Sequence, residues 1–232
     1  MQEHLARIGA VAAVVGAVML LVGTLLHPIQ ADPNNAVEAF TEYAADRIWI
    51  LSHLTQFVGV VALGAALVAL AGIMDAGRAA AWARIGAFGA ASAVAAGAAL
   101  QAVDGVALKV VADRWAAASG ESRALAFEAA FAVRQVEIGL ASLFSVLFGL
   151  TALAFSVSIC FSRRFANWLG AVGLIGGSGT FAGGIAQSYT GFSSLAMVIG
   201  MSASFLLLLW AIALGVVMWR LAPQLGEIDR AI

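Results

Sequence analysis

Six polar side chains interrupt the apolar runs of this chain in three pairs, each with a spacing of three residues. The pairs are His53 and Gln56, Gln101 and Asp104, and Arg134 and Glu137. Because residues three apart share one face of a helix, both members of a pair point in one direction. Imidazole and carboxyl groups can exchange protons with a substrate or bind a metal ion, and amides add hydrogen bonds. The spacing therefore predicts polar helix faces that could bind a ligand or carry out acid–base chemistry.

The composition indicates a polytopic membrane protein. Hydrophobic residues make up 62% of the 232 residues and charged residues 11%, whereas soluble domains carry about 25% charged residues. The net charge of −1 offers no attraction to nucleic acid. A single cysteine, Cys160, excludes an internal disulfide. With three prolines and no low-complexity linker, we expect residues 1–232 to form a single transmembrane domain.

Six apolar runs are long enough to cross a bilayer, which takes about 20 helical residues. They span residues of about 8–27, 47–74, 84–112, 129–161, 167–188 and 194–219. The runs are too long for strands and do not alternate with a period of two, so the fold class is all-α, a six-helix bundle. The first run is longer than the core of a signal peptide and no A-x-A cleavage site follows it, so we expect it to be retained.

The basic residues predict the orientation of the bundle. Seven of them would lie close to the helix ends on one side: Arg7, Arg78, Arg84, Arg163, Arg164, Arg220 and Arg230. The other side would carry Arg47, Arg114 and Arg123, with Lys109 and Arg134 near the helix ends. We therefore expect both termini in the cytoplasm, and the acidic segments 32–46 and 113–128 on the outside of a bacterial inner membrane.

A short helical cap is expected over the outer face. The stretch "ADPNNAVEAFTEYAAD" reads as a turn, an N-cap at Asn34 or Asn35 and a short amphipathic helix. Its Val37, Phe40 and Tyr43 would lie on the membrane surface or over the mouth of a pocket. The third and fourth long helices would extend beyond the membrane into this cap.

Polar residues from five helices fall at one height when distances are counted from the cytoplasmic arginines. With a rise of about 1.5 Å per residue, the level lies roughly 30–40 Å from that side, near the outer edge of the hydrocarbon core. The residues at this level are His27, His53, Asp104, Glu137 and Gln187. We expect an outward-opening pocket lined by His53, Gln56, Asp104 and Glu137, with His27, Gln101, Arg134 and Gln187 around them.

Each polar residue also has a structural interpretation. Arg134 and Glu137 could form a local ion pair. Asp104 has no basic residue three or four positions away, so its partner must come from another helix, with His27, His53 and Arg134 as candidates. His27 precedes Pro28, which should end the first helix, and could serve only as an interfacial cap.

A metal or haem site is a further alternative at this level. The side chains of His27, His53, Asp104 and Glu137 could bind a divalent metal, although no H-E-x-x-H spacing supports this. His27 and His53 could also be axial ligands of a haem.

Glycine and alanine repeats predict close helix packing. The stretch "GLIGGSGTFAGG" at 173–184 lacks the Lys-Ser/Thr ending of a P-loop and instead has glycines four apart. Gly9, Gly16 and Gly23 recur every seven residues and predict a packing seam on the first helix. These seams also leave self-association into a homo-oligomer open.

The stretches "HPIQADP", "FTEYAADRIWILSHLTQFVG", "QAVDGVALKVVADRW", "AVRQVEIGL" and "YTGFSSLA" give the chain a family resemblance. Together they resemble a group of uncharacterised six-helix integral membrane proteins from actinobacteria, over nearly the whole length. The resemblance implies an inner-membrane location and no particular activity.

Three functions remain as alternatives. The leading one is a pocket for a small or amphipathic ligand. The second is an integral membrane enzyme in which Asp104 or Glu137 is the general acid and His53 the base, acting on a lipid-like or isoprenoid substrate, with or without a metal or haem. The third is an accessory subunit whose polar layer consists of structural ion pairs.

Overall fold

The computed structural model describes the backbone of residues 1–231 and the side chains of residues 1–227. Within this part of the chain all regular structure is helical, as the apolar runs predict. The elements are α1 (Gln2–Leu26), α2 (Ala36–Ala45), α3 (Trp49–Gly72), α4 (Arg78–Gln101), η1 (Ala102–Leu108), α5 (Lys109–Ala117), α6 (Gly120–Phe161), α7 (Asn167–Thr190) and α8 (Ser194–Ala231).

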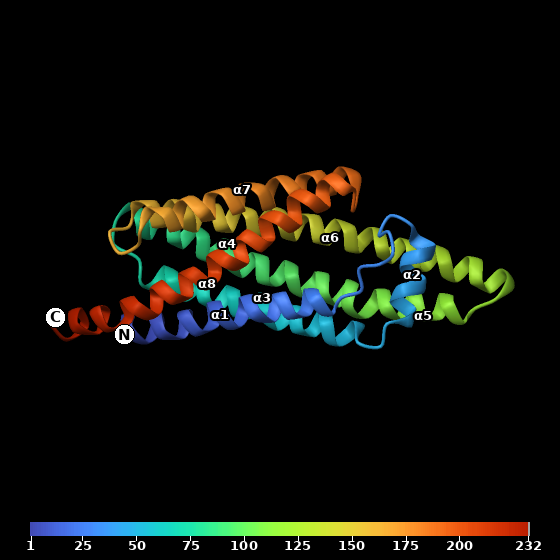
Figure 1. Cartoon of the computed structure of the whole chain (residues 1–232), viewed down its shortest axis with the longest axis horizontal. Helices are drawn as coiled ribbons and strands as arrows, with labels where there is room; N and C mark the ends of the chain where they lie inside the picture. Colours follow the sequence, from blue (N-terminus) through green and yellow to red (C-terminus); the bar gives the residue numbers. More distant parts are fainter. Residues whose placement is uncertain (232) are drawn as a thin grey trace.

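Six helices are long and apolar enough to cross a membrane. They are α1, α3, the continuous rod formed by α4, η1 and α5, then α6, α7 and α8. Figure 1 shows them running side by side along one long axis, with both termini at the same end of the bundle. The prediction of six spanning helices is confirmed, and the rod and α6 extend beyond the apolar runs, as far as Ala117 and back to Gly120.

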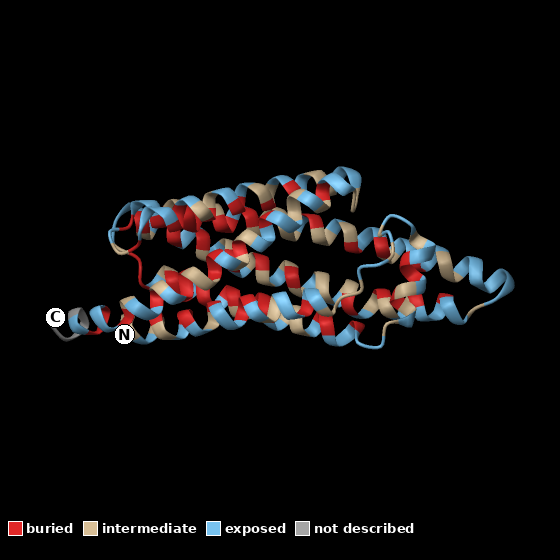
Figure 2. Cartoon of the chain, viewed as in Figure 1, coloured by how far each residue is buried: buried red, intermediate tan, exposed pale blue. Residues whose placement is uncertain are grey.

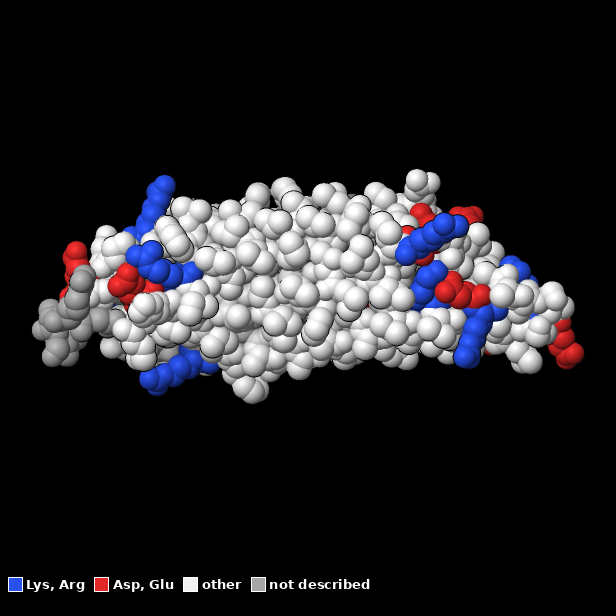
Figure 3. Space-filling view, turned by 90° about the horizontal axis from the view of Figure 1, so that it is seen from below, with Lys and Arg blue, Asp and Glu red and all other residues white. Residues whose placement is uncertain are grey.

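Apolar and charged side chains are distributed as a bilayer would require. Buried residues follow the helix faces that meet inside the bundle, whereas outward faces are exposed (Figure 2). Large apolar residues such as Phe88, Ile175 and Val198 are among the exposed ones, although soluble proteins seldom expose broad apolar surfaces. On the face seen in Figure 3, charged residues gather at the two ends and leave an uncharged band between them. The side chain of Arg230, expected among the basic residues near the termini, lies outside the described residues.

The glycine seam predicted on α1 packs against α3. A Cβ added to Gly16 would lie 2.8 Å from the backbone nitrogen of Leu63, and one added to Gly23 would lie 2.8 Å from the carbonyl oxygen of Ser52. These contacts leave no room for a side chain and let the two backbones approach closely. The glycines of α7 do the same, since a Cβ on Gly177 would lie 3.1 Å from the carbonyl oxygen of Gly149 on α6.

At the end that carries the termini, Asp75 fastens the α3–α4 loop to the α6–α7 loop. Its Oδ2 accepts hydrogen bonds from Ser162 Oγ at 2.5 Å and from the Arg163 amide at 2.8 Å. Its Oδ1 lies 2.9 Å from Arg164 Nε. Behind these loops an apolar core includes Leu70, Phe155 and other large side chains of α3, α6, α7 and α8.

At the opposite end α2 lies across the bundle (Figure 1), and this segment is called the cap below. Asn35 is its N-cap, and the side chain accepts a hydrogen bond from the Glu38 amide. Phe40 and Tyr43 are buried in an aromatic cluster with Trp49 and Trp115. Val37, the third residue expected on the membrane surface or over a pocket mouth, is 52% exposed.

Candidate functional site

A cavity of about 440 Å³ lies beneath the cap, at the end of the bundle away from the termini. Eight ionisable or amide side chains line it: His27, Glu42, Tyr43, Gln56, Gln101, Asp104, Arg134 and Glu137. The apolar part of the lining includes Leu100, Ala141, Phe192, Met197 and Met201. The cavity therefore offers both polar groups and apolar surface to a ligand, as small-molecule pockets do.

Asp104 lines this cavity and is paired with His53, which lies behind it. His53 Nε2 lies 3.2 Å from Asp104 Oδ2, and the imidazole is only 2% exposed. The other ring nitrogen, Nδ1, lies 2.7 Å from the carbonyl oxygen of Trp49. Because a carbonyl oxygen can only accept a hydrogen bond, Nδ1 carries the proton. Nε2 is the nitrogen that faces Asp104. Asp104 thus receives its partner from another helix, as predicted.

Asp104 lies in a π-helical segment, η1, inserted between α4 and α5. Gly105, the next residue, packs directly on His53, since an added Cβ would lie 2.5 Å from the Cβ of His53. Trp49 Nε1 donates a hydrogen bond of 3.1 Å to the carbonyl oxygen of Asp104. Such π-helical turns are rare and occur frequently at functional sites. Here the turn brings the Asp104 carboxyl group to both His53 and the cavity.

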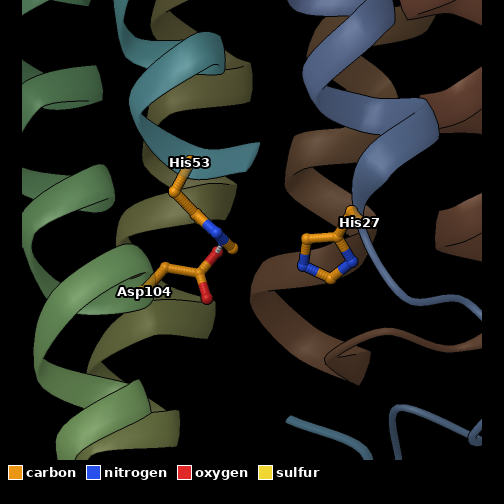
Figure 4. Close-up of side chains that lie close together, drawn as sticks. All are labelled: His27, His53 and Asp104. Carbon is orange, nitrogen blue, oxygen red and sulfur yellow. Dashed lines mark ion pairs between the residues drawn. The ribbon is translucent and has the colours of Figure 1, made fainter. Parts of the chain in front are cut away.

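His27 faces the same two side chains from the end of α1 (Figure 4). It follows the last residue of the helix in an extended conformation, with φ −74° and ψ 137°. Its Nδ1 lies 2.7 Å from the carbonyl oxygen of Pro28 and therefore donates to it. The ring centroid is 5.1 Å from that of His53 and 4.7 Å from that of Trp49. Desolvation by burial lowers the pKa of His27 below its usual value of 6.5, against the opposing hydrogen bond to Pro28.

Arg134 and Glu137 form a buried ion pair on the α6 side of the cavity. Arg134 Nη1 lies 2.7 Å from Glu137 Oε2, and the two side chains are 6% and 4% exposed. Nη2 of the same guanidinium donates to the carbonyl oxygen of Pro33 at 3.1 Å. The guanidinium carbon also lies 4.8 Å from the ring centroid of Phe192. The pair therefore ties α6 to the loop before α2 and to the α7–α8 turn.

Residues of the cap complete the lining of the cavity. Both carboxylate oxygens of Glu42 accept backbone hydrogen bonds of 3.0 Å, from Gln30 and Ala31. Lys109 Nζ donates to the carbonyl oxygens of Tyr43 and Ala44 at 3.1 and 2.9 Å. Burial raises the pKa of Tyr43 to about 12, so its phenol faces the cavity as a neutral group.

Two of the predicted pocket residues lie outside the main cavity wall. His53 lies behind Asp104 and borders a second cavity of about 180 Å³ with Gln101, so it acts on the main cavity through Asp104. Gln187 lies on α7 and is not among the residues that line either cavity. The count of residues along the helices gave no information about the direction in which α7 presents this side chain.

Several lining residues were not anticipated. Glu42 adjoins Tyr43, which was expected near the pocket mouth, so its position in the cap was a usable signal. Met197 and Met201 are four residues apart and share one face of α8, a spacing that could have identified them. The π-helical turn has no recognisable sequence signal.

Compared with models of protein families, with curated proteins and with solved structures, the chain matches none of them. The chemistry of the site therefore has to be argued from its own geometry. The cavity offers a carboxyl group paired with an imidazole, a second imidazole, and a fixed ion pair, all next to an apolar surface.

Proposed function

We propose that this protein is a multi-pass protein of the bacterial inner membrane whose cavity binds a small amphipathic molecule. In this proposal both termini are cytoplasmic and the cavity opens toward the outer side of the membrane. The head group of the ligand lies beside Asp104 and Gln101, and its apolar part lies along Met197 and Met201. The observation that carries the proposal is the mixed polar and apolar lining of the 440 Å³ cavity.

Exposed apolar residues at the rim support entry from the bilayer. Met201 lines the cavity and is 57% exposed on α8, and Ile29 lines it and is 81% exposed. The apolar part of the lining therefore continues onto the outer surface of the bundle. A lipid-like molecule could slide its apolar part in along this path while its head group reaches the polar side chains.

The charges of the wall restrict the head group. Glu42, Asp104 and Glu137 contribute three carboxyl groups, against one guanidinium from Arg134. An anionic head group would meet net repulsion, because like charges in a weakly screened site cost free energy. We therefore propose a neutral or cationic head group.

Mass spectrometry of molecules that co-purify with the protein tests this proposal. Ala141→Phe should fill the apolar part of the cavity, whereas Leu143→Phe adds the same ring at a position of α6 that is 59% exposed. A stoichiometric amphipathic molecule should be found in the wild-type protein and in Leu143→Phe but not in Ala141→Phe. Equal amounts in all three proteins, or none in the wild type, would contradict the proposal.

The contact between His53 and Asp104 favours a second candidate, acid–base catalysis on a lipid-like or isoprenoid substrate. A carboxyl group oriented by a buried imidazole can pass a proton to a bound substrate. Glu137 is less suited to this role because one of its oxygens is held by Arg134 at 2.7 Å. Asp104→Asn separates the alternatives: loss of turnover with unchanged stability supports catalysis, whereas lost stability alone supports an accessory subunit with structural ion pairs.

A further inference from the structure

The side chains of His27, His53 and Asp104 converge from three different elements, the end of α1, α3 and the π-helical turn (Figure 4). One potential ligand atom from each lies within 4.8 Å of the other two. From this convergence we propose that the three residues bind one divalent transition-metal ion, Zn²⁺ or Fe²⁺. The proposal goes beyond ligand binding by the cavity, because it requires no organic ligand.

The orientation of both imidazoles fits metal coordination. Each ring donates its Nδ1 proton to a backbone carbonyl oxygen at 2.7 Å, His27 to Pro28 and His53 to Trp49. In each case the Nε2 lone pair is left for another partner. Histidines that bind metals usually donate their second ring N–H to a carbonyl or carboxylate oxygen, which fixes the ring and the tautomer. Two such rings facing one carboxylate are therefore oriented as a metal site requires.

The distances fit a coordination sphere after a closure by His27. Ligand bonds to Zn²⁺ are about 2.0–2.2 Å for nitrogen and oxygen, so adjacent ligand atoms lie about 3 Å apart. His53 Nε2 and Asp104 Oδ2 are 3.2 Å apart and already meet this spacing. The ligand atom of His27 lies up to 4.8 Å from the others, so it has to approach by up to about 2 Å. His27 is the C-cap of α1, with an extended backbone and an amide that donates to the Thr24 carbonyl oxygen, so the movement falls to its side chain and the end of the helix.

The surroundings of the three ligands favour a bound cation. Asp104 brings a carboxyl group that is only 16% exposed, and its Oδ1 has no hydrogen-bond partner among the described residues. His27 and Asp104 both line the main cavity, so a metal between them would keep coordination positions open to it. Two imidazoles and one carboxylate form the ligand set of catalytic zinc sites and of non-haem iron sites. Ca²⁺ and Mg²⁺ prefer sites made of oxygen ligands alone.

Metal binding to the purified full-length protein tests the site. The protein is prepared in detergent with a tag that contains no histidine, stripped with a chelator and titrated with Zn²⁺ in competition with a coloured chelator. Co²⁺ provides a second, spectroscopic reading of the ligand set. We expect one metal ion per chain, and an affinity at least about tenfold lower in His27→Ala and in Asp104→Asn, since even changes outside the ligand set cost that much.

His4→Ala is the matched control, because His4 is the remaining histidine of the chain and is exposed near the N-terminus. It should bind Zn²⁺ as the wild type does. Absence of saturable binding in the wild type, or unchanged affinity in His27→Ala or in Asp104→Asn, would overturn the proposal. If Asp104→Asn fails to fold, His27→Ala decides, because the half-buried His27 ring lies at the end of α1.

The metal site and the amphipathic ligand can fail separately. Ala141→Phe removes none of the three metal ligands, so it should keep Zn²⁺ while losing the co-purifying molecule. If His27→Ala loses the metal but keeps the co-purifying molecule, both proposals hold, and the metal and the molecule bind at separate sites. A wild-type protein that holds the molecule but no metal would refute the metal site alone.

Discussion

Replacing Arg134 with methionine should destabilise the bundle, and neutralising Glu137 in the same chain should restore part of the loss. The guanidinium and the carboxylate are 2.7 Å apart and are 6% and 4% exposed. Methionine keeps most of the apolar stem of arginine but leaves the carboxylate of Glu137 buried without its partner. A buried charge without compensation is far more costly than a neutral amide in the same place.

The expected magnitudes follow from this burial. Removal of one partner of a buried ion pair costs about 3–5 kcal/mol, and we expect this range for Arg134→Met. In the double variant Arg134→Met/Glu137→Gln the buried charge is gone. What remains is the lost hydrogen bond to Pro33, about 1 kcal/mol, and the lost ring contacts with Phe192 and Tyr43, about 1 kcal/mol together. The second substitution should therefore recover about 1–3 kcal/mol.

Reversible unfolding in mixed micelles of dodecyl maltoside and sodium dodecyl sulfate measures these free energies. Arg114→Met is the control, because Arg114 is an exposed arginine near the same end of the bundle. It should change the free energy of unfolding by less than about 0.5 kcal/mol. The buried ion pair would be contradicted if adding Glu137→Gln to the Arg134→Met protein gives no gain in the free energy of unfolding. It would also be contradicted if Arg134→Met lowers the free energy of unfolding as little as the control does.

Three other predictions concern the two ends of the bundle. Burial opposes ionisation of Asp75, but hydrogen bonds and Arg164 lower its pKa overall. The stability that the carboxylate contributes is therefore present above pH 3.8 and is lost as the pH falls through its lower folded pKa. The melting temperature of Asp75→Asn should be below that of the wild type at pH 7, and the two melting temperatures should converge in acid. In Tyr189→Phe, where Tyr43 is the remaining tyrosine, absorbance at about 295 nm should show ionisation near pH 12 and not near 10; a transition near 10 in the folded protein would contradict the burial of Tyr43. Lys109→Met removes two hydrogen bonds to the end of α2. Amide hydrogen exchange in residues 36–45 should therefore accelerate about fivefold or more, while that of α7 stays unchanged. If the variant and the wild type exchange at equal rates in α2, Lys109 does not hold the cap in place.

Much of the fold could be predicted because the bilayer leaves few alternatives. Apolar runs longer than about 20 residues have to be helices, and glycines at regular spacing have to face neighbouring backbones. The seam through Gly16 and Gly23 confirms this reasoning. Helix lengths also fixed the height of His27 and Asp104 along the bundle axis, since the rise per residue is constant.

The direction in which each side chain points could not be obtained in the same way. Gln187 does not line the cavity, because the rotation of α7 is set by its contacts with α6 and α8. The π-helical turn at Asp104 alters the rotation of the rod without changing its hydropathy. The contact between His53 and Asp104 depends on this turn and on Gly105, so only the folded chain reveals it.

A crystal structure of the protein, extracted from its own membrane without exchange of bound lipid, tests the central claim most directly. The decisive observation is the electron density inside the cavity. An elongated molecule is expected, with its polar end beside Asp104 and its apolar part along Met197 and Met201. A cavity that holds only water, or one that has collapsed so that its walls touch, would contradict the proposal that this protein binds an amphipathic ligand.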